Sequence, residues 1–183
     1  MALRLHKEET SFLMIDVQER LLPSIDRREA VVLNAVRLLK TAELLSLPVL
    51  YTEQYPKGIG STEASVLAAL PKGARRVEKM TFSCCEEPGF LEAFETTMRP
   101  VTVVFGTESH ICILSTLEDL LERGRKIVLA ADACGSRTSD NHNLALATAR
   151  SCGALVLPTE TVVYQLLGRS GTPEFKAMLP FFK

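Results

Sequence analysis

Short apolar runs alternate along this chain with longer stretches in which apolar residues recur every three or four positions. The short runs predict buried strands, and the longer periodic stretches predict amphipathic helices. These runs cover 11–15, 48–51, 100–105, 126–131 and 154–157, and a further strand is predicted at 75–78, a mainly charged segment. The predicted helices cover 28–47, 62–70, 89–98, 112–123, 140–151 and 159–167, and a tail through residue 182 follows them.

Strands that are each followed by a helix are typical of a parallel sheet with helices on both faces. Asp140 is expected to be the N-cap of the helix at 140–151, because a carboxylate there accepts hydrogen bonds from free backbone N–H groups. The chain has no internal repeat and no low-complexity linker. We therefore predict one α/β domain over residues 1–183.

The composition narrows the class of protein. With 183 residues, 46% of them hydrophobic, the chain can build a full core without disulfides or metals. The net charge of −1, with no block of like charge, disfavours a nucleic-acid or membrane partner. The sequence shows neither a signal-peptide core nor an apolar run of membrane-spanning length. A cytoplasmic location is predicted, with an organellar address left open.

The cysteines and histidines show no spacing that is typical of metal ligands. The count of five cysteines is odd, and the chain is not small, so a disulfide framework is not expected. The sequence contains no CxxC pair and no HxxxH pair, and its three histidines are scattered. We predict neither a metal site nor a cofactor.

The segment 101–112 carries the strongest chemical signal. An apolar run ends at Gly106, a polar turn follows, and Cys112 then enters the apolar pattern of a helix. A thiol in the first turn of a helix lies near unpaired N–H groups and the positive end of the helix dipole, which favour the thiolate. Cys112 is therefore a candidate nucleophile. The alternative is a small buried core residue, as free cysteines commonly are.

Two further candidates follow other strands of the predicted sheet. Ligands of an open parallel sheet bind beyond the carboxyl ends of its strands, where Asp16 and Lys79 are expected to join Cys112. Asp16 would take the thiol proton and later give it to a leaving amine. Lys79 would lower the pKa of the thiol and balance the charge of Asp16. The alternatives are a capping or ion-pairing role for the aspartate and a solvated lysine.

Four segments, in this order along the chain, resemble the isochorismatase-like cysteine hydrolase superfamily: 12–18, 78–83, 106–113 and 131–136. Within it, the segments 52–58, 165–168 and 173–176 are similar to the isochorismatase domain-containing proteins. The resemblance extends over nearly the whole chain. It implies a Rossmann-like three-layer sandwich around a six-stranded, mainly parallel sheet.

The resemblance also implies an Asp–Lys–Cys catalytic triad, which matches Asp16, Lys79 and Cys112. The superfamily has a cis peptide bond before the nucleophile, and the corresponding bond here is Thr107–Glu108. That bond would turn an N–H group toward the reacting atoms, so the Glu108 and Cys112 N–H groups are expected to form the oxyanion hole. A non-proline cis bond costs about 3 kcal/mol.

The superfamily cleaves several kinds of substrate. Some members hydrolyse amides such as nicotinamide or carbamoyl compounds, and isochorismatases cleave a vinyl ether without the thiol. The nicotinamidase branch has an Asp-x-His metal site after its second strand. The matching segment 52–55 has no histidine, so no catalytic metal is predicted.

Several side chains near the predicted strand ends are candidates for a substrate pocket. They are Gln18, Glu53, Gln54, Tyr55 and Phe82. A packing role fits Tyr55 and Phe82 equally well. His110 precedes the candidate nucleophile by two residues, and a structural role is expected for it because alternate positions of a turn point apart.

The predicted function is that of a metal-independent cysteine hydrolase that cleaves a small amide or related C–N bond through a Cys112 thioester. The alternative is a catalytically weak or inactive binding or scaffold protein with the same fold. A metal-dependent nuclease is disfavoured by the balanced charge. The resemblance implies a homo-oligomer, and the apolar segments 162–167 and 178–182 would either dock on a neighbour or fold back on their own sheet.

Overall fold

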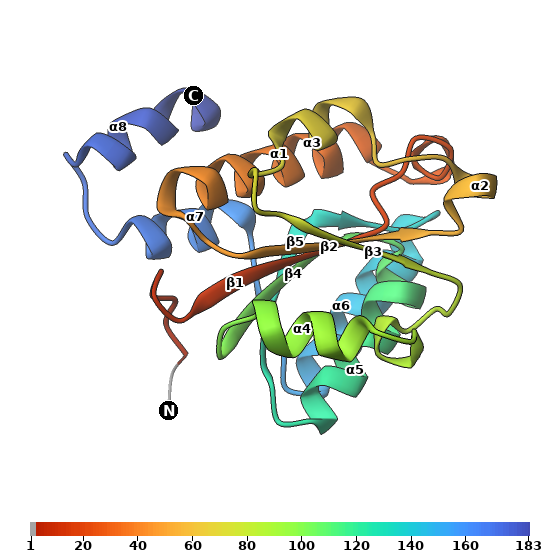
Figure 1. The fold of residues 1–183 in the computed structure, drawn as a ribbon. Coiled ribbons are helices and arrows are strands. Elements are labelled where there is room, and N and C mark those ends of the chain that lie inside the picture. Colours follow the sequence, from red (N-terminus) through yellow and green to blue (C-terminus); the bar gives the residue numbers. More distant parts are fainter. Residues whose placement is uncertain (1–2) are drawn as a thin grey trace.

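Six parallel strands form one sheet at the centre of the computed structural model, which describes residues 3–183 (Figure 1). The strands, in chain order, are β1 Thr10–Ile15, β2 Val49–Gln54, β3 Arg75–Lys79, β4 Val101–Thr107, β5 Lys126–Gly135 and β6 Leu155–Leu157. Their order across the sheet is β3-β2-β1-β4-β5-β6, and every neighbouring pair is parallel. The prediction of a six-stranded α/β sheet is confirmed.

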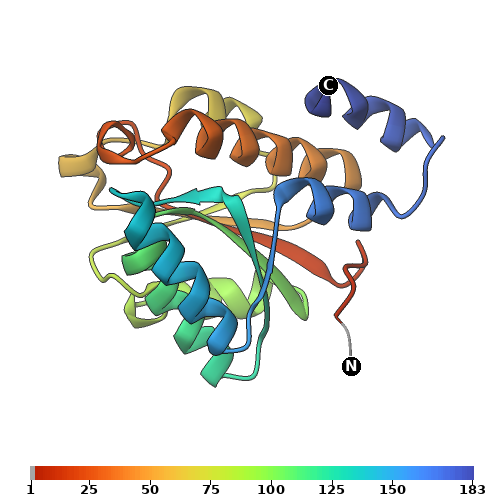
Figure 2. The same cartoon turned by 180° about the vertical axis from the view of Figure 1, so that it is seen from behind.

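Helices cover both faces of this sheet, which gives the three layers expected (Figures 1 and 2). One layer contains α1 Arg28–Leu45, α3 Ala64–Ala69, α7 Thr159–Leu167 and α8 Pro173–Met178. The other contains α4 Phe90–Thr97, α5 Leu114–Glu122 and α6 Ser139–Ser151. The short α2, Pro56–Ile59, lies beyond the carboxyl end of β2.

The chain reverses its winding direction between β1 and β4, and these two strands are the most deeply buried. All residues of both strands are buried, as the continuous apolar runs predict. Phe12 and Phe105 contact each other edge to face, with ring centroids 6.0 Å apart. A ligand site is expected at the carboxyl ends of these strands, since that is the switch point of the sheet.

Gly106 allows β1 and β4 to approach each other closely at that point. It pairs with Ile15 and has a φ of +129°, a backbone conformation that residues with a Cβ atom rarely adopt. A Cβ atom at this position would lie 2.0 Å from the carbonyl oxygen of Ile15. The glycine that ends the apolar run therefore also sets the spacing of the two strands that carry the candidate site.

The structure corrects several predicted boundaries. Thr138, and not Asp140, is the N-cap of α6, because its backbone is extended and its hydroxyl accepts a hydrogen bond from Asn141 N at 3.2 Å. β5 continues past the predicted end at Ala131 to Gly135. The helices α2 and α8 were not expected, although Thr172 followed by Pro173 is a cap and first-turn signal for α8.

The tail folds back on its own chain. The Tyr164 ring of α7 contacts the rings of Phe175 and Phe182, with centroids 6.0 and 5.8 Å away, and the Arg37 guanidinium lies 4.7 Å from the Phe182 ring centroid. The segment 162–167 lies in α7, which contacts β5 of its own sheet, whereas Phe182 of the tail packs on α7 and α1. Among the helices of residues 3–183, none has both the length and the apolar character needed to cross a membrane.

Candidate active site

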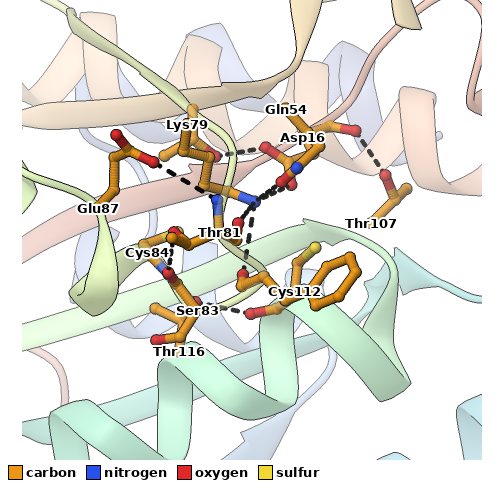
Figure 3. A network of polar contacts seen from close by, with 12 residues as sticks. Asp16, Gln54, Lys79, Thr81, Ser83, Cys84, Glu87, Thr107, Cys112 and Thr116 are labelled. Atoms are coloured by element: carbon orange, nitrogen blue, oxygen red, sulfur yellow. Dashed lines mark hydrogen bonds and ion pairs between the residues drawn. The ribbon is translucent and has the colours of Figure 1, made fainter.

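The three predicted catalytic side chains meet at the carboxyl edge of the sheet (Figure 3). The Lys79 Nζ lies 2.7 Å from Asp16 Oδ2, and neither side chain is exposed. The Cys112 sulfur lies on the side of its turn that faces this ion pair. Cys112 itself is 6% exposed. Residues that are far apart in the sequence thus form one buried, closely spaced group.

Asp16 is held in place from two sides. It follows β1 directly, with a φ of +52°, which turns the chain away from the strand direction. The Thr52 hydroxyl donates a hydrogen bond to Asp16 Oδ1 at 2.7 Å, and the Thr107 hydroxyl donates one to the Asp16 carbonyl at 2.5 Å. These neighbours on β2 and β4 orient the carboxylate toward Lys79.

Lys79 ends β3, and its ammonium group is surrounded by oxygen atoms. Besides Asp16, it donates to Gln54 Oε1 and, at 3.2 Å, to the Thr81 carbonyl. Burial by itself would lower the pKa of Lys79, but the neighbouring charges, chiefly that of Asp16, outweigh it, and the pKa is raised. The lysine therefore stays charged although it is buried.

Cys112 lies in a π-helical turn, η3 (Ser109–Ile113), which precedes α5. The sequence predicts that a helix terminus favours its thiolate, but in the free protein the pKa of the thiol is raised. Burial, and then the negative charge of Asp16, raise the pKa of Cys112 to about 12, while Lys79 opposes them. The thiol is therefore protonated at neutral pH, so it needs a neighbouring base before it can attack a substrate.

The backbone on the amino-terminal side of Cys112 has two notable features. The Thr107–Glu108 peptide bond is cis. Among the backbone hydrogen bonds found in residues 3–183 outside the helices and strands, none has the Glu108 N–H as its donor. The buried Glu108 carboxylate pairs with Arg137, whose Nε lies 2.8 Å from Glu108 Oε1.

The histidines near this turn bind it to neighbouring elements. The Nδ1 atom of His110 lies 2.9 Å from Ser136 Oγ, and the Nδ1 atom of His142 lies 2.9 Å from Ser109 Oγ. His110 thus contacts the end of β5 rather than the Cys112 sulfur, in agreement with the structural role expected. Arg137 and His142 were missed because nothing in the sequence pattern indicates that the start of α6 packs on η3.

Of the predicted pocket residues, Gln54 joins the ion pair, whereas Glu53 and Gln18 have other partners. Successive side chains of a strand point to opposite faces, so Glu53 points away from Lys79. Its carboxylate accepts two hydrogen bonds from Thr62 and contacts Arg76 at 3.2 Å.

Gln18 is fully buried, and within residues 3–183 its side chain is found bonded only to backbone atoms. Its Nε2 donates to the carbonyls of Gln54 and Gly60 at 3.0 and 2.6 Å. Its Oε1 accepts from Gln54 N at 2.7 Å. These contacts give Gln18 a structural role that residue type alone did not indicate.

The two aromatic candidates lie at the surface. Tyr55 is 46% exposed and Phe82 is 63% exposed. Tyr55 lines a cavity of about 350 Å³ together with Lys79, Met80 and Glu87. Phe82 is close to the site through its backbone, since its carbonyl lies 3.5 Å from Lys79 Nζ. Within the described part of the chain, no group of three or more His, Cys, Asp and Glu side chains could hold a metal ion.

Most of the chain is similar to known proteins. The model of the isochorismatase domain family matches residues 10–161. Isochorismatase domain-containing protein 2A of Mus musculus is 35% identical over 181 residues, which cover 98% of this chain and 85% of that protein. These values agree with the resemblance found in the sequence motifs.

Solved structures are similar over the same length. The structure of the MAR1 ribonuclease from Caenorhabditis elegans has a TM-score of 0.90 at 30% identity, and the match covers 98% of this chain and 92% of that one. YcaC of Escherichia coli, described as an octameric hydrolase of unknown specificity, has a TM-score of 0.92 at 18% identity, with 99% and 91% covered. The second match shows the fold alone.

Proposed function

This chain belongs to the isochorismatase family, and from that premise we propose that it is a cysteine hydrolase of small amides or related C–N bonds. The observation that carries the proposal is the buried Asp16–Lys79 ion pair, 2.7 Å long, with the Cys112 thiol beside it. Burying ionised groups is unfavourable unless they are paired. A buried carboxylate, ammonium group and thiol that lie together therefore indicate a functional site.

In the proposed reaction, Asp16 acts first as a base. It takes the Cys112 proton while the sulfur bonds to the carbonyl carbon and the π electrons move to the carbonyl oxygen. The tetrahedral intermediate then expels the amine, which receives the proton from Asp16. A water molecule hydrolyses the resulting thioester by the same route: Asp16 takes a proton from the water, the C–S bond breaks, and the sulfur regains a proton.

Lys79 and the backbone would stabilise charge during these steps. Since the pKa of Cys112 is about 12 in the free protein, the thiolate forms only as the substrate is attacked, and the Lys79 ammonium then lies beside it. The Glu108 and Cys112 N–H groups are the proposed donors to the oxyanion. A preorganised donor of this kind contributes about 2.7–4 kcal/mol to transition-state stabilisation.

The site is suited to a small, uncharged substrate. Asp16 and Lys79 carry opposite charges and the thiol is neutral, so a charged substrate would bring an unpaired charge into a buried site at high cost. Gln54, Tyr55 and Phe82 remain the candidate substrate contacts, and no catalytic metal is proposed.

We also propose that the protein is a homo-oligomer located in the cytoplasm. Self-association is proposed from the resemblance to the superfamily, and no number of subunits is assigned to this chain. The alternative of an inactive binding or scaffold protein is not favoured, because packing alone does not require a buried Asp–Lys–Cys group.

The test is hydrolysis of a panel of short uncharged amides by the purified protein, followed as release of ammonia or amine. An RNA oligonucleotide belongs in the panel because of the name of the Caenorhabditis elegans relative. Cys112→Ser and Asp16→Asn should abolish hydrolysis, whereas Cys152→Ser, at an exposed cysteine, should not. Acid quenching during turnover should trap an acyl group on the Cys112 peptide, detected by mass spectrometry. Hydrolysis that survives in Cys112→Ser, or RNA cleavage without amide hydrolysis, would overturn the proposal.

A further inference from the structure

The Thr116 side chain links the loop after β3 to the turn that carries Cys112 (Figure 3). Thr116 is fully buried in α5. Its hydroxyl donates a hydrogen bond to the Cys112 carbonyl at 2.6 Å and accepts one from Cys84 N at 2.9 Å. One hydroxyl thus joins two segments that lie 28 residues apart in the sequence, between Cys84 and Cys112.

The loop held by Thr116 is also the loop that surrounds Lys79. Its Thr81 carbonyl accepts a hydrogen bond from Lys79 Nζ at 3.2 Å. The Thr81 hydroxyl in turn donates to the Ser83 carbonyl at 2.7 Å, directly before Cys84. A short chain of bonds therefore leads from the ammonium group of Lys79 to the backbone of Cys112.

We propose that Thr116 is a positioning residue that fixes the Cys112 turn against the Lys79 loop for the reaction proposed above. It touches no reacting atom, and it acts through the backbone of Cys112. Without the hydroxyl, the Cys84 N–H and the Cys112 carbonyl would lose a partner inside the protein, and the turn and the loop would separate to reach water. A displacement of about 1 Å at a reacting group can cost roughly a hundredfold in rate.

Loosening the turn should affect the thiol and the reaction in opposite directions. Burial is the main reason why the pKa of Cys112 is raised, so a turn open to water would give a lower pKa and faster alkylation. Turnover would fall, because the sulfur would no longer be held beside Asp16 and Lys79. A residue that only stabilised the fold would not produce this pair of changes.

The experiment compares Thr116→Val, Thr116→Ser and Thr41→Val in the full chain. Thr41 is a matched control, since it is fully buried in α1 and its hydroxyl donates to the Arg37 carbonyl four residues earlier at 2.8 Å. In Thr116→Val, kcat for amide hydrolysis should fall at least tenfold with KM within about threefold of wild type. Alkylation of Cys112 by iodoacetamide at pH 8, followed by peptide mass spectrometry, should become at least about tenfold faster.

Thr116→Ser should restore both quantities, and Thr41→Val should leave both unchanged. Wild-type kcat and wild-type alkylation in a folded Thr116→Val protein would overturn the inference while leaving the proposed function intact. If the wild-type protein hydrolyses no amide, the proposed function fails and the alkylation rate alone decides on Thr116. Thr116→Ala replaces the valine variant if thermal melting shows that the latter is unfolded.

Discussion

Lys79 Nζ lies 2.7 Å from Asp16 Oδ2, and neither side chain is exposed to solvent. The two residues come from the ends of strands that are separated by β2 in the sheet. Thr52 and Gln54, both on β2, bridge this separation: Thr52 donates to Asp16, and Gln54 accepts from Lys79. The central strand of the three therefore supplies the polar groups that let a buried ion pair form across it.

Removing one partner of this pair should strongly destabilise the fold. Lys79→Met and Asp16→Asn should each lower the free energy of unfolding by about 3–5 kcal/mol, because each leaves the other group buried without its partner. The double variant should be more stable than the sum of the two losses predicts. Urea unfolding of the four proteins measures this coupling. Single variants that are as stable as the wild type would contradict the prediction.

The sequence predicts the three catalytic candidates better than their surroundings. Asp16 follows an apolar strand, Cys112 comes after another by a short turn, and Lys79 ends the mainly charged β3. The parallel topology brings these strand ends to one edge of the sheet. The strand register decides which face of the sheet the Glu53 and Gln54 side chains point to. It places Gln54, and not Glu53, on the same face as Lys79. The structural bonds of Gln18 depend on the path of the loop at Gly60. The raised pKa of Cys112 depends on burial, which local sequence does not give.

Gln18 should matter for stability and not for substrate binding. Gln18→Ala removes three hydrogen bonds to backbone groups of Gln54 and Gly60, and each buried group left unpaired costs about 1–3 kcal/mol. The KM of hydrolysis should stay near that of the wild type. Gln54→Ala is the contrasting variant, since it removes a ligand of Lys79 and should lower kcat. Urea unfolding together with steady-state kinetics separates the two effects. A large change in KM for Gln18→Ala would place the residue in the substrate pocket instead.

The cysteines should differ in their response to alkylation. The exposed Cys152 should react with iodoacetamide before the buried Cys112 at pH 8. From pH 8 to pH 9, the rate at Cys112 should rise about tenfold, because its pKa of about 12 lies above both values and the thiolate fraction grows with each pH unit. Peptide mass spectrometry measures the rates, and Cys112→Ser identifies the signal. A rate at Cys112 that levels off below pH 9 would show a much lower pKa.

His142 should make the fold less stable in mild acid. Burial, with the Arg27 charge added and the Asp26 charge opposing it, lowers the pKa of His142 from 6.5. The unfolded chain then binds a proton more readily than the folded one. This contribution to stability is present above pH 6.5 and is lost as the pH falls through the folded-state pKa. The free energy of unfolding should fall less steeply between pH 7 and pH 5 in His142→Asn, at roughly the scale of 1.4 kcal/mol for each unit of pKa shift. Equal slopes in the wild type and in His142→Asn would contradict the prediction.

Gly106 should tolerate no side chain. In Gly106→Ala, the added Cβ would lie 2.0 Å from the backbone oxygen of Ile15, and β1 and β4 would have to move apart to relieve the contact. The φ of +129° adds to the cost because residues with a Cβ rarely adopt it. We expect a loss of about 4 kcal/mol or more in the free energy of unfolding, which belongs to the exceptional range for a single substitution.

Gly73→Ala provides the control, since a Cβ there would contact nothing within 4 Å, and it should unfold at the wild-type urea concentration or slightly above it. Because Gly106 spaces the strands that carry Asp16 and the Cys112 turn, any Gly106→Ala protein that does fold should also hydrolyse amides more slowly. Wild-type stability and wild-type turnover in that variant would show that the two strands can separate without disturbing the site.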